Sequence, residues 1–312
     1  FQTNLLVVEP YHGLGNRLRA YASAAALARK SGRHLIIVWI PDVHVDARFR
    51  DLFDMDMHAV FDQPVLPALH RMDPKVLIYD YNTKGRKDEV LRDRSHSTIY
   101  VRSAYILQSE TKVSESDVVG ELQLLNPVLS IKKRVAIAVE IILQNHVFLV
   151  GIHIRMQSDL NIDVPGIGGL PTGHAAGTSA MGPVKHQRER CHYTTFFPHM
   201  EKAMLENQHV SFLVASDTEA AIIGLRERFG KRIVSVVDEG KECQGVSTRG
   251  VACLQAALVE FLTISRVSSM LILSDWSSSS ELLRRLSPKG TPHVNGCHRR
   301  GGVLTREYFR DF

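Results

Sequence analysis

The sequence lacks several features that would assign it to a common class of protein. No apolar run approaches the roughly 18 residues that a membrane-spanning helix needs, and no dense stripe of Lys and Arg marks a nucleic-acid-binding surface. No Asn-x-Ser/Thr acceptor for N-glycosylation occurs. The four cysteines, Cys191, Cys243, Cys253 and Cys297, form no Cys-x-x-Cys pair, so we expect neither a zinc site nor a thioredoxin-like redox centre. Two disulfides are permitted, although a chain of this length does not need them.

The composition is that of an ordinary globular protein. The chain has 312 residues, which suits two domains, and it is 44% hydrophobic and 23% charged. Its net charge of +5 fits an anionic small substrate better than a nucleic acid. The chain starts at Phe1 rather than at a methionine, so the lack of a visible signal peptide does not tell in which compartment the protein works. The compartment stays open: the Golgi or endoplasmic reticulum lumen for a trimmed eukaryotic protein, the cytoplasm otherwise.

The first 40 residues predict a strand, a glycine turn, a helix and a second strand. The strands are Asn4–Glu9 and His34–Ile40, and the helix ends near Lys30. A dinucleotide-binding fingerprint would need glycine where Leu18 stands, and the nearest acidic residue, Asp42, follows a proline. We therefore disfavour that interpretation.

The glycine turn itself allows two interpretations. It contains Gly13, Gly15 and Asn16, with His12 before them and Arg17 after them. A glycine turn at the start of a helix can expose backbone N–H groups to an anion. The alternative is an ordinary tight turn in which Asn16 caps the helix.

A second stretch offers a charged site at the end of a strand. Residues 148–154 form an apolar, β-branched run typical of a buried strand. His153 and Arg155, two positions apart, project from the same face at its carboxyl end, where open α/β sheets bind ligands. Arg155 suits a diphosphate, because a guanidinium holds phosphate bidentately and keeps its charge. Pairing with a surface carboxylate is the alternative.

The remainder predicts alternating helices and strands with one irregular region. Residues 166–182 are rich in glycine and predict a long loop, either a lid or an acceptor-binding element or simple disorder. Further on, Ser216 and Glu219, like Ser278 and Glu281, have the spacing of a helix-capping box. Both helix starts follow predicted strands, so each could also favour an anion.

Taken together, four motifs resemble the GDP-fucose-dependent fucosyltransferases, which include protein O-fucosyltransferases and the alpha-1,2 and alpha-1,6 enzymes. The motifs are Gly13-Leu14-Gly15-Asn16, Gly151-Ile152-His153-Ile154-Arg155, Ala215-Ser216-Asp217 and Trp276-Ser277-Ser278. His153-x-Arg155 followed by Ser158-Asp159 is more similar to the protein O-fucosyl branch. The other two branches usually carry a second basic residue where Met156 stands. The branch is therefore left open.

The resemblance implies an α/β, GT-B-like fold of two facing Rossmann-like domains with a donor cleft between them. We expect an acceptor-side domain at residues 1–145 and a nucleotide-sugar-binding domain at residues 146–312. Expected partners are the nucleotide-sugar donor GDP-fucose and a protein or glycan acceptor, with no nucleic acid, no membrane span and no cofactor. The implied donor-binding residues are Gly13, Gly15, Asn16, His153, Arg155, Asp217, Ser277, Ser278 and Ser279. The implied catalytic residues are Arg155, Asn16 and His12.

The resemblance also implies an inverting reaction without a metal ion, with Arg155 neutralising the leaving diphosphate. The Asp-x-Asp spacing at Asp54 and Asp56 lies in the other half and predicts a surface loop. A base for the acceptor hydroxyl could be His12 or, further from the turn, Glu9, or a phosphate oxygen could take the proton. Two other functions stay open: a transferase using a different nucleotide sugar, and a non-catalytic relative that binds a carbohydrate or a peptide.

Overall fold

The computed structural model describes residues 4–54, 57–83, 86, 88–92, 97–156, 190–236 and 249–297. They belong to two compact units. The described part of unit 1 comes from Phe1–Lys132 and Val246–Gln255, and that of unit 2 from Lys133–Gly245 and Ala256–Tyr308. The predicted boundary after residue 145 lies at the other end of the same helix, α5 (Leu129–Asn145).

Unit 1 is built on a five-stranded parallel sheet with the strand order β3-β2-β1-β6-β4. The strands are β1 (Leu5–Pro10), β2 (His34–Val38), β3 (Ala59–Phe61), β4 (Leu77–Asp80) and β6 (Ile99–Ser103). β1 lies in the centre, and the apolar run that predicted it is buried. A separate parallel pair joins β5 (Val90–Leu91) to β7 (Gln108–Ser109).

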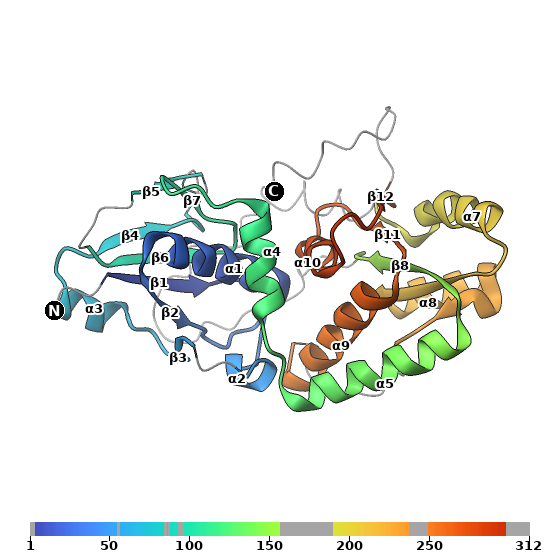
Figure 1. Cartoon of the computed structure of the whole chain (residues 1–312), viewed down its shortest axis with the longest axis horizontal. Helices are drawn as coiled ribbons and strands as arrows, with labels where there is room; N and C mark the ends of the chain where they lie inside the picture. The colour runs from blue at the N-terminus through green and yellow to red at the C-terminus, as the bar shows by residue number, and fades with distance from the viewer. Residues whose placement is uncertain are drawn as a thin grey trace. The chain divides into compact units, whose positions relative to one another are not determined.

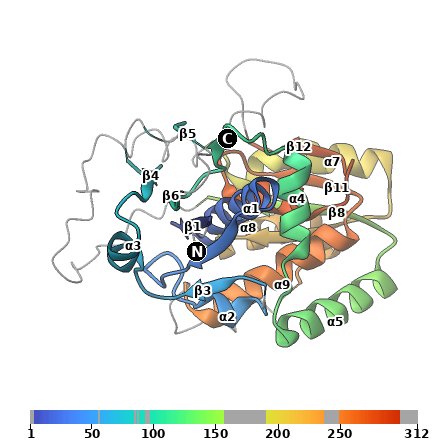
Figure 2. The same cartoon turned by 60° about the vertical axis from the view of Figure 1, so that its left-hand side comes forward.

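Helices lie against the sheet of unit 1 because each has an apolar side to bury. The helices are α1 (Leu14–Ser31), α2 (Phe49–Leu52), α3 (Leu66–Met72) and α4 (Glu115–Leu124). Leu69 of α3 packs with Val7 and Tyr100 of the sheet. α1 and α4 lie side by side (Figures 1 and 2), and an ion pair of 2.6 Å joins Lys30 to Asp117. α1 ends at Gly32, whose φ of 65° suits glycine.

Unit 2 contains a second five-stranded parallel sheet, with the order β10-β9-β8-β11-β12. The strands are β8 (Phe148–Ile154), β9 (Val210–Ser216), β10 (Ile233–Val234), β11 (Met270–Leu273) and β12 (His293–Asn295). β8 is the central strand, and helices cover both faces of the sheet. This position explains why its sequence is a nearly continuous apolar run, broken only by His153, rather than an alternating one.

The two faces of this sheet have separate apolar cores. On one face Phe196, Met200 and Leu225 pack against Ile152; they come from η2 (Tyr193–Phe196), α7 (Phe197–Glu206) and α8 (Glu219–Phe229), which η3 (Gly230–Arg232) follows. On the other face Ile142, Ile264 and Leu283 pack against Leu149; they come from α5, α9 (Val251–Val267) and α10 (Ser278–Leu286).

Two parallel α/β units confirm the predicted fold class. The sequence interpretation missed α4, although Ser114 and Asp117 form a capping box at its start. It also missed β12, which has only three residues. The glycine-rich loop predicted at residues 166–182 lies outside the described residues, as do Ser158 and Asp159.

Candidate functional site

Three strand exits of unit 2 meet at the carboxyl edge of its sheet. β8 lies between β9 and β11, so the residues that follow these strands are neighbours. Asp217 and Ser274, which follow these strands, each accept a hydrogen bond from the backbone of Arg155 or Met156. The N–H of Arg155 donates to Ser274 Oγ at 2.8 Å, and the N–H of Met156 donates to Asp217 Oδ1 at 2.8 Å. The neighbouring strands therefore hold the chain at the point where it leaves β8.

Arg155 is fixed by a carboxylate. Its Nη1 lies 3.0 Å from Asp217 Oδ2, and the side chains are only 16% and 13% exposed. The sequence left open that Arg155 pairs with a surface carboxylate. Arg155 does pair with a carboxylate, but that of Asp217 is largely buried and also accepts from the backbone N–H of Met156. Asp217 therefore orients the guanidinium at the sheet edge. The implied role of Asp217 in binding the donor stays a prediction.

His153 connects the central strand to helix α10. The residue is 5% exposed, and its Nδ1 lies 2.7 Å from Ser280 Oγ. Its ring packs edge-on against Phe261, with 5.6 Å between ring centroids. These contacts join His153 to the first turn of α10, and its implied role in binding the donor stays a prediction.

The start of α10 presents backbone donors beside this edge. Ser277 is the N-cap, and its side chain accepts from the N–H of Ser280 at 3.3 Å. Ser278 and Ser279 occupy the first two helical positions, whose N–H groups have no carbonyl partner inside the helix. Such groups favour an anion. Trp276, in front of the cap, has a φ of 53° and is 51% exposed.

Both predicted capping boxes are wrong in detail. At α10 the cap is Ser277 rather than Ser278, and Glu281 instead pairs with Arg285 at 2.5 Å. At α8 the cap is Thr218, which makes no side-chain capping bond. Ser216 is still part of β9, and its Oγ accepts from the N–H of Thr218 at 3.2 Å.

A disulfide braces the turn that leads into α10. Cys191 and Cys297 are bonded to each other. The N–H of Asp275, the residue before Trp276, donates to Cys297 Sγ at 3.1 Å. Cys253 is also in a disulfide, and Cys243 lies outside the described residues.

In unit 1 the glycine turn starts α1 without a side-chain cap. The N-cap is Gly13, so Asn16, which we considered as a cap, is instead the third residue of the helix. Gly15 lies beside it and is buried. His12 has a φ of 63°, which places a strained residue directly before the turn. The first N–H groups of α1 thus resemble those of α10.

Arg17 stabilises this turn from within. It is 1% exposed; Nε donates to the carbonyl of His12 at 2.9 Å, Nη1 donates to the carbonyl of Ile40 at 2.7 Å, and Nη2 lies 2.8 Å from Asp42. The guanidinium also stacks on Trp39. Burial lowers the pKa of Arg17, and Asp42 opposes this effect. The sequence placed Arg17 beside a bound anion, but all its nitrogens are occupied by the protein.

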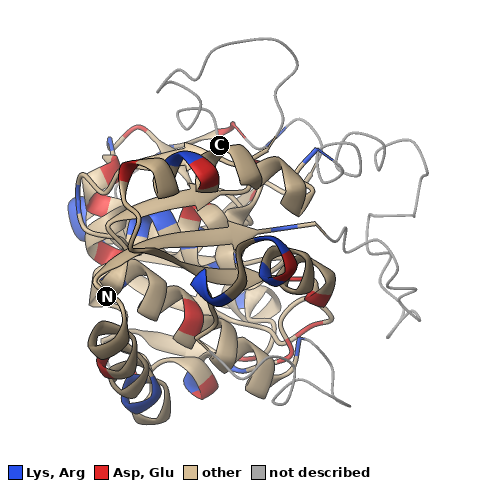
Figure 3. Ribbon diagram, turned by 90° about the vertical axis from the view of Figure 1, so that its right-hand side faces the viewer, with Lys and Arg blue, Asp and Glu red and all other residues tan. Residues whose placement is uncertain are grey.

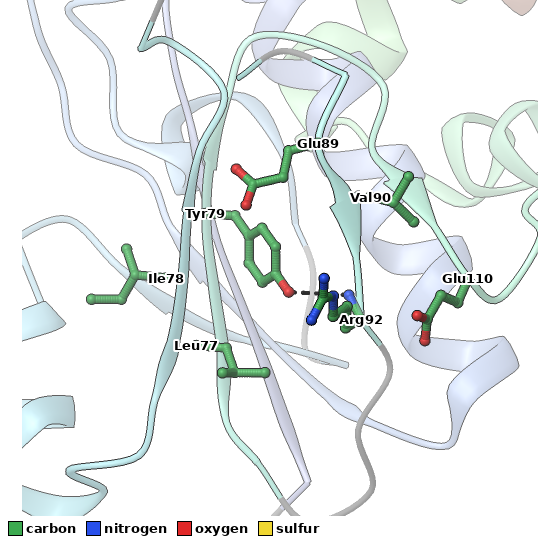
Figure 4. Close-up of a pocket in the computed structure, with 7 residues that line it drawn as sticks. All are labelled: Leu77, Ile78, Tyr79, Glu89, Val90, Arg92 and Glu110. Atoms are coloured by element: carbon green, nitrogen blue, oxygen red, sulfur yellow. Dashed lines mark hydrogen bonds between the residues drawn. The ribbon is translucent and has the colours of Figure 1, made fainter. Parts of the chain in front are cut away.

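A pocket with a volume of about 720 Å³ lies along β4. Its lining residues fall between Leu77 and Glu110, and none of them is a predicted site residue. Figure 4 shows Tyr79 in its centre, with its hydroxyl accepting from the backbone N–H of Arg92 at 3.1 Å. Glu89 and Glu110 border it. No predicted donor residue lines it, so it does not add to the donor site.

The described residues show few signs of other site types. They contain no group of three or more His, Cys, Asp or Glu side chains arranged to hold a metal ion. Asp54 is described, but Asp56 is not, so the Asp-x-Asp stretch cannot be placed as a unit. Over the same part of the chain, no helix has both the length and the apolarity to cross a membrane. Basic and acidic residues are interspersed in Figure 3.

Comparisons with known proteins were made by sequence and by structure. No protein-family profile and no curated protein match this sequence. Among solved structures, NodZ alpha-1,6-fucosyltransferase soaked with GDP-fucose matches with a TM-score of 0.56 and 17% identity over 92% of this chain and 94% of that one. POFUT1 in complex with GDP-fucose matches with a TM-score of 0.54 and 13% identity over 95% and 99%.

FUT1 of Arabidopsis thaliana in complex with GDP is a third match, with a TM-score of 0.53 and 13% identity over 93% of this chain and 72% of that one. These three proteins are fucosyltransferases of the GT-B fold. The present chain therefore has the fold of GDP-fucose fucosyltransferases. The resemblance that the four motifs predicted is confirmed at the level of the fold.

Proposed function

We propose that this chain is a glycosyltransferase that transfers fucose from GDP-fucose to a hydroxyl group of a protein or glycan acceptor, with inversion and without a metal ion. The observation that carries the proposal is Arg155, held by Asp217 at the carboxyl edge of the sheet in unit 2. The fold shared with the fucosyltransferases supports it.

In this reaction the acceptor oxygen forms a bond to C1 of fucose while the bond from C1 to the β-phosphate oxygen breaks. GDP leaves with the electron pair, so negative charge grows on the diphosphate. A guanidinium already oriented by Asp217 stabilises that charge without reorganising. The N–H groups of Ser278 and Ser279 add partial positive charge at the start of α10.

The acceptor gives up one proton, for which His12 is the proposed base. His12 borders the glycine turn, and its ring lies near His44, with 5.4 Å between centroids. Glu9, the other candidate, is buried and bound to Tyr100 and Arg102. Asn16, in the first turn of α1, is proposed to contact the sugar and the phosphate.

The disulfides suggest a compartment. One bridge joins Cys191 to Cys297, and Cys253 is in another. Disulfides persist in oxidising surroundings. We therefore propose that the protein folds in the endoplasmic reticulum or Golgi lumen, or outside the cell.

A ligand screen by thermal shift tests the donor. GDP should raise the melting temperature more than UDP or NAD, because a ligand that binds only the folded state stabilises it; at 100 times Kd the gain is about 2.7 kcal/mol. Hydrolysis or transfer from GDP-fucose should continue in excess EDTA. A larger shift with NAD and none with GDP would overturn the proposal. Loss of turnover in EDTA, restored by manganese, would overturn its metal-independent form. GDP binding without turnover would favour a non-catalytic relative.

A further inference from the structure

Helix α5 carries apolar side chains on its outer side as well as on its inner one. On the inner side Val135 is fully buried, and Ile142 belongs to the core on one face of the unit 2 sheet. Ile137 and Ile141, one turn apart on the other side, are 58% and 55% exposed, and Leu143 is 55% exposed. The outer side of a surface helix is ordinarily polar. Exposed apolar side chains gathered on one helix therefore indicate a surface that another molecule covers.

Two residues of opposite charge share this outer side. Lys133 and Glu140 are both exposed and lie seven positions apart in the part of α5 that belongs to unit 2. Seven positions are two helical turns, so both side chains point from the same face. The turns separate them by roughly 10 Å, whereas charges that pair within one helix are three or four positions apart. Between them along this face lie the exposed Ala136 and Ile137.

The order of these four residues matches its own reverse. Two copies of α5 can run antiparallel about a twofold axis between Ala136 and Ile137. Lys133 of one copy then lies level with Glu140 of the other, and the same pair forms again on the far side of the axis. The two Ile137 side chains meet beside the axis. A twofold interface joins the same surface of both copies, so a homodimer needs this kind of self-complementarity.

The position of the acidic residue favours a second copy of the chain over a lipid surface. A helix that lies on a membrane has Lys and Arg on its polar face and an uncharged apolar face. In α5, Glu140 stands among the exposed apolar residues, one turn from Ile137 and next to Ile141. Its negative charge opposes anionic lipids, whereas Lys133 of a second copy complements it.

We propose that the chain forms a homodimer through the outer side of α5 (Figures 1 and 2), with Ile137 at the centre and a Lys133–Glu140 pair between the copies on each side of it. The inference does not depend on the proposed function, because none of these residues belongs to the donor site. One helix from each copy makes a small interface, so we expect a reversible dimer with a Kd of roughly 1–100 μM.

Analytical ultracentrifugation of the whole chain over a concentration series tests the proposal. The wild type should pass from monomer to dimer as the concentration rises. Ile137→Ser should weaken the dimer about tenfold or more, because it removes the apolar centre. The matched control is Ile223→Ser, which changes a 48% exposed isoleucine of α8 and should leave the Kd unchanged. Both variants should melt like the wild type, since both positions are exposed.

Charge reversal gives the sharpest outcome. Lys133→Glu and Glu140→Lys should each weaken the dimer about tenfold, because each places like charges opposite one another on both sides of the axis. The double reversal should recover the wild-type Kd, because both pairs form again with their signs exchanged. A double variant as weak as the single ones would overturn the proposal.

Four other results would also overturn the homodimer. One is a chain that stays monomeric at about ten times the expected Kd. Another is Ile137→Ser that dimerises like the wild type. A third is a monomer that binds anionic phospholipid vesicles and loses this binding in Ile137→Ser, which would assign the surface to a membrane. The last is a monomer that Ile137→Ser destabilises, which would show that another segment of the same chain covers α5.

Discussion

Arg17 and Arg155 are both arginines next to a sheet edge, yet their surroundings give them different tasks. Arg17 is 1% exposed, and each of its guanidinium nitrogens binds a group of the protein: two backbone carbonyls and the carboxylate of Asp42. Arg155 is 16% exposed and receives Asp217 on Nη1. A buried arginine of the first kind organises a loop, whereas the ligand-binding role of Arg155 stays a prediction that a substitution can test.

At the residue scale we predict that Arg155→Ala abolishes measurable transfer from GDP-fucose. Losing an oriented contact to the leaving diphosphate typically costs about 3 kcal/mol in the transition state, or a factor on the order of a hundred or more in rate. Arg155→Lys should recover little, because an ammonium cannot form the bidentate fork. Initial rates with wild-type circular dichroism measure the effect.

The matched control is Arg228→Ala, which removes a 2.8 Å ion pair with Glu201 between exposed side chains. It should change stability by no more than about 1 kcal/mol and leave transfer intact. Near wild-type transfer by folded Arg155→Ala would defeat the assignment of the site.

Also at the residue scale, Arg17→Ala should lower the free energy of unfolding by about 3 kcal/mol, because it removes a buried ion pair and leaves two carbonyls unpaired. Urea denaturation measures the change. Arg50→Ala, on an exposed position of α2, should change it by less than about 0.5 kcal/mol. An Arg17→Ala protein as stable as the wild type would show that the turn does not depend on this residue.

At the element scale, the central strand of unit 2 is limited by the closeness of α9. A methyl group at Gly151 would lie 2.5 Å from Ile264 Cγ2 and 2.6 Å from Ser268 Oγ. The glycine of the Gly151–Arg155 motif thus allows helix and strand to touch. It gives the motif a packing role in addition to any role at the site.

The corresponding prediction compares two glycines. Gly151→Ala should lower the free energy of unfolding by about 2 kcal/mol, the usual cost of overpacking a core. Gly120→Ala, inside α4 with nothing within 4 Å of the new methyl group, should raise it by roughly 0.5–1 kcal/mol, since alanine favours helix. Thermal and urea melts of both variants measure the pair. Equal effects would mean that α9 yields easily to the extra atom.

At the scale of the whole molecule, covalent links and the path of the chain both join distant segments. The Cys191–Cys297 bridge closes a loop with a sequence separation of 106. In unit 1, Asp46 pairs with Gly250, and Gln255 Nε2 donates to the carbonyl of Asp51 at 2.7 Å. Segments about 200 positions apart in sequence therefore complete one unit.

We predict that replacing both Cys191 and Cys297 by alanine lowers the free energy of unfolding by about 4.7 kcal/mol, the value that loop-closure entropy gives for a loop of this length. Because Cys297 also accepts from the N–H of Asp275 before α10, GDP affinity should fall as well. Denaturation and GDP titration of the double variant measure both effects. Unchanged GDP affinity in a folded double variant would show that the turn into α10 holds its shape without the bridge.

The sequence by itself determined the features that rest on local chemistry. The apolar run at β8, the glycine turn before α1 and the β1–α1–β2 unit follow from periodicity and turn residues. The four motifs together were enough to predict the fold that the solved fucosyltransferases share. The position of Arg155 at the exit of a buried strand could also be predicted from the sequence, because a charged residue directly after an apolar run is a local pattern; its role at a donor site stays a prediction.

Tertiary structure decided which partner each side chain has. Pairing of distant strands placed Glu9, Arg102 and Asp80 in register on three adjacent strands, and no local pattern records that register. Packing also buried Arg17 among the carbonyls of His12 and Ile40 and the carboxylate of Asp42. These outcomes depend on contacts between residues far apart in the chain, which become neighbours only when the sheets form.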